Sequence, residues 1–137
     1  MIKIKLGQYL ALKAEQEQLE AEIKAFYETY IKSPSGSLSM FDMPRGSILP
    51  DPTAMFAERA ARLHIKLLMK KYEVMEALEA IEDAVSTLEP GERLLMREHY
   101  INGLKWEKVC ERIGYSWAQT HRIHRNAIRK LEGLAGS

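Results

Sequence analysis

The residues with the most marked chemistry lie between Trp117 and Leu131, where positive side chains gather without any negative one. This stretch holds two histidines, no Asp or Glu, and four cations, namely Arg122, Arg125, Arg129 and Lys130. Nucleic-acid backbones carry one negative charge per phosphate, so a helix with a basic side and an apolar side is a candidate for lying against nucleic acid.

The spacing of the apolar residues predicts which side of this helix is buried. Those that recur at intervals of three and four are Thr120, Ile123, Ala127, Ile128 and Leu131. The opposite side then carries the candidate DNA contacts, which are Trp117, Ala118, Gln119, His121, Arg122, Arg125 and Arg129.

A helix that enters the major groove by its N-terminus presents its first two turns to base edges and its later cations to phosphates. Arg122 and Gln119 can pair with guanine and adenine edges, and Trp117 could pack on a thymine methyl group or on the sugar backbone. We expect Arg125, Arg129 and Lys130 to bind phosphate. Two further cations, Lys105 and Arg112, are candidates for contacting the flanking strand.

Other kinds of chemistry find no support in the sequence. His121 and His124 are three residues apart, but no third metal ligand follows at a suitable spacing. The single cysteine, Cys110, cannot form an internal disulfide, and we expect it to pack at a helix crossing. Neither a Gly-rich nucleotide loop nor a nucleophile motif is present, so we expect no enzyme activity, no cofactor and no metal.

The segments before the basic helix predict how it is positioned. Residues 92–101 form an amphipathic pattern, with Leu94, Leu95, Tyr100 and Ile101 as its apolar residues and Arg93, Arg97 and Glu98 as its polar ones. Asn102-Gly103 is a turn signal. A short helix should begin near Trp106 and bury Val109, Cys110 and Ile113, with Gly114 ending it and Ser116 capping the next helix. Helix, tight turn and basic helix together make the helix-turn-helix plan.

The N-terminal part predicts a long helical arm. Over residues 8–31 a seven-residue repeat places Leu12, Leu19 and Phe26 in one row and Tyr9, Gln16, Ile23 and Tyr30 in the other. Residues 33–52 hold four prolines, two glycines and five serines, which predicts a loop.

A second long helix should run from Asp51-Pro52, with Asp51 as its N-cap, to about Leu88. Its predicted inner rows are Ala60, Leu67, Val74, Ile81, Leu88 and Phe56, Leu63, Lys70, Ala77, Ala84, widened by Leu78 and Val85. His64 should face solvent, and Met55, Met69 and Met75 should be packing residues.

These elements predict an all-α protein, in which a long antiparallel coiled-coil hairpin (residues 1–89, with the loop 33–52) precedes a helix-turn-helix head (residues 90–137). Residues 1–89 carry 11 Lys/Arg against 14 Asp/Glu, and residues 90–137 carry 9 against 5. The head is therefore the basic part, as a nucleic-acid surface requires. Because the first helix is the shorter one, apolar surface should remain for another chain, and we expect a homo-oligomer through residues 8–31 and 53–88.

The residues also carry a resemblance to a known family. The stretches Leu94–Tyr100, Gly103–Ser116 and Ala127–Leu131 resemble the promoter-binding region four of bacterial sigma factors. The whole layout, with Met40-Phe-Asp-Met-Pro44 in the loop, resembles the phage and prophage regulators of the RinA and ArpU type. That resemblance implies an activator of phage late genes that binds double-stranded DNA through a sigma-like helix-turn-helix. Sigma factors usually have Arg and Glu where this chain has Trp117 and Ala118, which indicates a specificity of its own.

Two alternatives stay open: a DNA-packaging adaptor like the small terminase subunits, and an adaptor that binds host RNA polymerase. The chain has no apolar run of the ~20 residues that cross a bilayer, and its start lacks the apolar segment of a secretion signal. We therefore expect a cytoplasmic protein of the bacterial host cell, without contact to the membrane.

Overall fold

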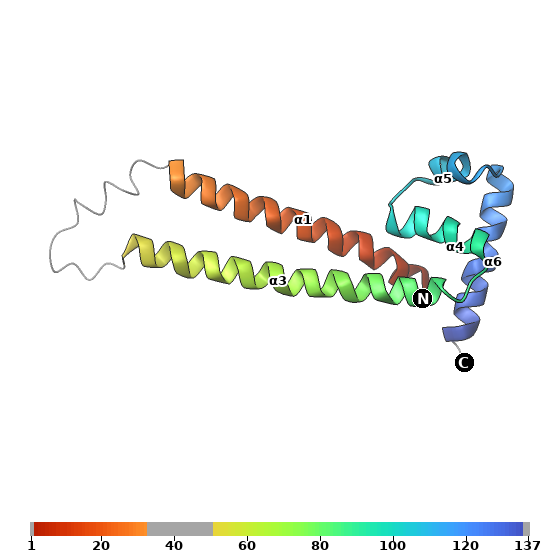
Figure 1. Cartoon of the computed structure of the whole chain (residues 1–137), viewed down its shortest axis with the longest axis horizontal. Helices are drawn as coiled ribbons and strands as arrows, with labels where there is room; N and C mark the ends of the chain where they lie inside the picture. The colour runs from red at the N-terminus through yellow and green to blue at the C-terminus, as the bar shows by residue number, and fades with distance from the viewer. Residues whose placement is uncertain (1, 33–50, 136–137) are drawn as a thin grey trace. The chain divides into compact units, whose positions relative to one another are not determined.

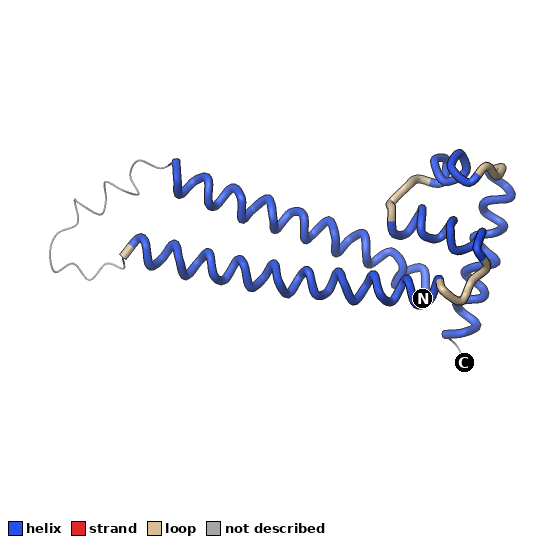
Figure 2. The backbone as a smooth tube through the Cα atoms, viewed as in Figure 1, coloured by secondary structure: helices blue, strands red, loops and turns tan. Residues whose placement is uncertain are grey.

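The computed structural model describes residues 2–32 and 51–135, and every element in these ranges is a helix (Figures 1 and 2). In chain order they are α1 (Ile2–Lys32), α3 (Pro52–Val85), α4 (Pro90–Met96), the π-helix η1 (Arg97–Ile101), α5 (Trp106–Ile113) and α6 (Trp117–Ala135). The all-α prediction is confirmed for this part of the chain. None of these helices has the length and hydropathy that crossing a membrane requires. The predicted loop 33–52 lies outside the described residues, except for its last two.

The described residues pack into two compact units. The arm unit is Ala14–Lys71, and the head unit is Met1–Lys13 together with Tyr72–Ser137. This division differs from the predicted division at residue 89, because the start of α1 and the end of α3 pack with the C-terminal elements. Leu6 and Tyr9 from α1 are buried in the same cluster as Ile81 from α3 and Leu95 from α4.

The arm unit is an antiparallel pair of helices. Near one end, the Lys70 Nζ atom donates to the Glu15 Oε2 atom at 2.7 Å. Near the other, the Phe56 ring stacks on Tyr30 with centroids 3.8 Å apart and on Phe26 at 4.8 Å. Residues early in α1 thus meet residues late in this part of α3, and the reverse.

The burial of both long helices follows the predicted rows. The two rows of α1 and the two rows of the second helix are all buried or half-buried, and Gln16 is half-buried as an isolated polar position. The start of α3 also agrees, since the Asp51 Oδ1 atom accepts from the Thr53 amide at 3.1 Å. His64 is exposed, and its Nε2 atom makes a 2.9 Å hydrogen bond with the Tyr27 hydroxyl.

Four expectations about these helices are corrected. The first helix begins at Ile2 and not near residue 8, because Leu6 is drawn into the head core. The second ends at Val85 and not at Leu88, although Leu88 stays buried beyond it. The two helices are 31 and 34 residues long, so the small difference in their lengths leaves little apolar surface uncovered. The three methionines are not packed within the chain: Met55, Met69 and Met75 are exposed.

The head core is built from the ends of the long helices and from α4, α5 and α6. Its fully buried side chains include Leu95, Met96, Val109 and Ala127, with Ile128 and Leu131 close to that. Gly103 and Gly114 have φ values of 73° and 76°, which supports the predicted glycine turn and glycine helix end. These two turns fix the directions of α5 and α6.

The segment 92–101 differs from its prediction. It is helical, but its second half is a π-turn, closed by a hydrogen bond from the Asn102 amide to the Arg97 carbonyl at 2.9 Å. The extra residue per turn rotates the following side chains. Glu98, which lies within the π-helix and is predicted to be on the polar side, is 8% exposed. Leu94 precedes the π-helix, and although it is predicted to face inward, it is 47% exposed.

Candidate nucleic-acid interface

The basic helix α6 follows α5 after the three residues Gly114, Tyr115 and Ser116. Gly114 adopts the left-handed conformation that ends α5, and its amide donates to the Cys110 carbonyl at 2.9 Å. Ser116 begins α6 as its N-cap, because its Oγ atom accepts from the Gln119 amide at 3.2 Å. Helix end, turn and helix start therefore follow one another as the sequence predicts.

The predicted core face of α6 is confirmed. Thr120, Ala127, Ile128 and Leu131 are buried, and Ile123 is half-buried. The Cys110 Sγ atom lies 3.3 Å from the Thr120 Oγ1 atom, so this cysteine packs at the crossing of α5 and α6. The crossing leaves the opposite side of α6 to solvent.

Three arginines form one row on that exposed side. Arg122, Arg125 and Arg129 are three and four residues apart, so they lie within one narrow sector of the helix and span about 10 Å. All three are exposed, and none makes an ion pair with a residue that the structure describes. We call these three residues the arginine row. Its charge is not neutralised within the described chain.

The start of α6 carries the neutral candidates. Trp117 is 54% exposed, and Ala118 and Gln119 are exposed beside it. Asn126, one polar residue that the sequence analysis missed, is exposed seven residues after Gln119, on the same side of the helix. Its spacing of seven residues from Gln119 is the sequence signal that predicts this shared side. Asn and Gln side chains can each pair in a bidentate way with adenine.

His121 and His124 do not belong to this surface. His124 is buried, and its Nε2 atom lies 2.7 Å from the Tyr100 hydroxyl. The His121 ring lies between Trp117, at 4.3 Å between centroids, and Trp106, at 5.2 Å. Its Nε2 atom is buried without a hydrogen-bond partner in the described part of the chain. The structure thus places His121 against aromatic rings and not among the exposed candidates.

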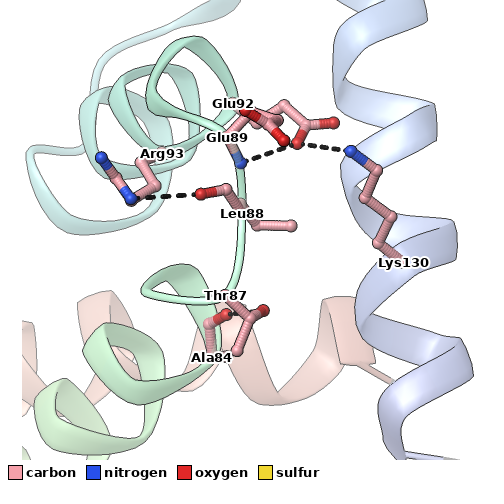
Figure 3. Close-up of polar contacts among 7 residues, drawn as sticks. All are labelled: Ala84, Thr87, Leu88, Glu89, Glu92, Arg93 and Lys130. Carbon is pink, nitrogen blue, oxygen red and sulfur yellow. Dashed lines mark hydrogen bonds and ion pairs between the residues drawn. The ribbon is translucent and has the colours of Figure 1, made fainter.

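Lys130 takes part in a structural contact. Its Nζ atom donates to the Glu92 Oε1 atom at 2.8 Å, and the same oxygen accepts from the Glu89 amide at 3.1 Å (Figure 3). Glu92 is 8% exposed, so its charge needs a partner of the opposite sign. Lys130 joins α6 to the start of α4, and its charge is less available to a phosphate than those of the arginine row.

The two flanking cations differ from each other. Arg112 is exposed, but its Nε atom lies 3.6 Å from an oxygen of Glu98, a carboxylate that is mostly buried. Lys105 is exposed at the start of α5 and makes no ion pair within the described residues. Of the predicted cations, the arginine row and Lys105 remain free to bind an anion.

No group of three or more potential ligands for a metal ion occurs among residues 2–32 and 51–135. Comparisons with protein-family models, with curated proteins and with solved structures find no match to this chain.

Proposed function

We propose that this chain is a sequence-specific DNA-binding transcription regulator. Its head would act as a sigma-like helix-turn-helix, with α6 in the major groove. The long helices would form a coiled-coil hairpin that joins copies into a homo-oligomer. The resemblance to the RinA and ArpU type makes activation of phage late genes the specific form of this proposal.

The observation that carries the proposal is the arginine row on α6. Arg122, Arg125 and Arg129 are exposed together, without a carboxylate partner in the described chain, on a helix that starts three residues after α5. Exposed side chains able to contact base edges, Gln119 and Asn126, lie along the same helix. In groove-binding helices, base contacts specify the sequence and phosphate contacts position the protein.

The test compares two arginines of the row on duplexes selected from a random DNA pool. Arg122→Ala should relax the base preference, because Arg122 is closest to the helix start, and the loss should be about 1–3 kcal/mol on the preferred duplex alone. Arg129→Ala should weaken binding to all duplexes evenly. A gel-shift titration gives both values.

The matched control is Lys24→Ala, which removes one positive charge from an exposed position in the arm unit. It should leave both affinity and preference unchanged. If both arginine variants bound as the parent chain does, the groove-binding proposal would be wrong. Equal affinity of the parent chain for all duplexes would instead favour the packaging-adaptor alternative.

A further inference from the structure

The helix α3 carries a second apolar row on the side away from its buried row. Its members are each more than half exposed and are Ile65, Leu68, Met69, Tyr72 and Met75. Four of them follow one another at intervals of three, four and three residues, which keeps them on one side of a continuous helix. We call these five residues the outer row. A contiguous exposed apolar surface of this kind marks an interaction site.

The charges of α3 divide at the centre of the outer row. Residues 59–71 contain five Lys/Arg and no Asp/Glu, and residues 73–83 contain five Asp/Glu and no Lys/Arg. The acidic half borders the row directly: the pKa of Tyr72 is raised above 10, because its hydroxyl is hydrogen-bonded to Glu76 and the negative charge of that carboxylate lies beside it. One helix thus presents two opposite charges on either side of a shared apolar centre.

This pattern is complementary to itself in one direction only. If a second α3 lies antiparallel, the basic half of each helix faces the acidic half of the other. If it lies parallel, like charges face each other. A two-fold symmetric contact needs a surface that is complementary to itself, which the antiparallel arrangement supplies.

We infer that the outer row is the contact between two copies of this chain, paired through antiparallel α3 helices. In heptad register, Leu68 then packs against Tyr72 of the second copy and Ile65 against Met75. At the edge, Arg62 lies beside Glu76 of the second copy, in exchange for its exposed 2.9 Å ion pair with Glu58 of its own chain. This inference names the surface of the proposed oligomer but does not depend on DNA binding.

The first experiment measures the mass of the full chain by sedimentation velocity over a range of concentrations, without DNA. The parent chain should be a dimer. Leu68→Ser should raise the dissociation constant about a hundredfold, because each dimer loses two buried leucines. Leu94→Ser is the matched control, since Leu94 is 47% exposed outside the row, and it should leave the mass unchanged.

The second experiment tests the direction of the helices by exchanging charges. Arg62→Glu alone and Glu76→Arg alone should each raise the dissociation constant about tenfold, since each places like charges together twice per dimer. The double variant should restore the parent value, because it rebuilds both pairs with reversed signs.

Each other outcome counts against the inference. A parent chain that stays monomeric, or a Leu68→Ser chain whose dimers dissociate no more readily than those of the parent chain, would overturn the inference. If the dissociation constant of the double variant were no lower than those of the single variants, the antiparallel pairing would be excluded. Circular dichroism of each variant at 222 nm checks that the helices are retained.

Discussion

Trp106 has three histidines against its indole ring. His99 stacks on it with centroids 3.8 Å apart, His124 lies at 4.5 Å, and His121 lies at 5.2 Å. The His99 Nδ1 atom is 2.8 Å from the Leu104 carbonyl, which can only accept, so this nitrogen carries the hydrogen. The rings pack together from η1, α5 and α6; His124 is buried there, and His99 and His121 are half-buried.

The His99 environment makes the head sensitive to acid. Burial lowers the pKa of His99 below 6.5; the hydrogen bond to Leu104 opposes this shift, and the charge of His121 adds to it. Because the folded pKa is the lower one, protonation favours the unfolded chain. The contribution of neutral His99 to the free energy of unfolding is therefore fully present above about pH 6.5. It is lost as the pH drops through the folded pKa.

We expect the melting temperature of the chain to be lower at pH 5 than at pH 7.5. His99→Phe, which keeps a ring on Trp106 but cannot be protonated, should show a smaller drop between the two values. Thermal melts followed by circular dichroism measure both. An equal drop in the variant and the parent chain would show that His99 is not a source of the acid sensitivity.

Tyr100 and His124 form the buried polar pair of the same region. Burial raises the pKa of Tyr100 to about 12, so its hydroxyl stays protonated at neutral pH. This hydroxyl and the His124 Nε2 atom are 2.7 Å apart. Polar groups placed inside a core need such partners, and the pair explains why a histidine is tolerated on the inner side of α6.

At the scale of the elements, the direction in which α6 follows α5 depends on one residue with a left-handed backbone conformation. Gly114 has φ 76° and ψ 23°, and a Cβ atom placed on it would meet nothing within 4 Å. The cost of a side chain there is therefore one of backbone conformation and not of collision.

Gly114→Ala should lower the free energy of unfolding by about 1 kcal/mol. The matched control is Gly7→Ala, since Gly7 is helical and also has open space around its Cβ position. That change should raise the free energy of unfolding by up to about 1 kcal/mol, because alanine is the better helix former. Urea titrations of both variants give the two signs. A neutral or stabilising Gly114→Ala would contradict the role of the glycine in ending α5.

The start of α4 shows how two elements can share one carboxylate. Glu92 accepts from the Glu89 amide and from Lys130 of α6, while the Arg93 Nη1 atom donates to the Leu88 carbonyl at 3.2 Å (Figure 3). The first bond satisfies an amide that the start of a helix would otherwise leave without a partner. The contact therefore serves both as a helix cap and as a tie between α4 and α6.

At the scale of the whole molecule, the proposed DNA binding and the proposed dimer together predict how the DNA affinity depends on salt concentration. Each neutralised phosphate contributes about −0.9 to the slope of log affinity against log salt. The arginine row should give a slope of about −3 for one head, and about −5 for a dimer whose two heads bind one duplex. Binding titrations at four or more salt concentrations measure the slope.

The variants separate the contributions to this slope. Arg129→Ala should reduce it by about one per head. Leu68→Ser should reduce it towards the value of a single head if the outer row pairs the copies. A slope near zero would contradict the DNA proposal and leave the dimer inference intact, whereas an unchanged slope in dissociated Leu68→Ser would show that heads bind singly.

The sequence by itself determined the features that depend on neighbours along the chain. The inner rows of the long helices, the glycine at the end of α5, the Ser116 cap and the exposed arginine row all follow from a period of 3.6 residues and from local hydrogen bonds. The direction in which each of these side chains points is set within its own helix. For that reason they were correctly predicted from their spacing.

Only the tertiary structure decided the features that depend on contacts between distant residues. It drew Leu6 into the head core, turned Glu98 inward through a π-turn, gave Lys130 a buried carboxylate partner and placed His121 and His124 against Trp106. Each of these is a polar or terminal residue whose position is set by a partner on another helix. Such partners are brought close by packing, which spacing along one helix does not encode.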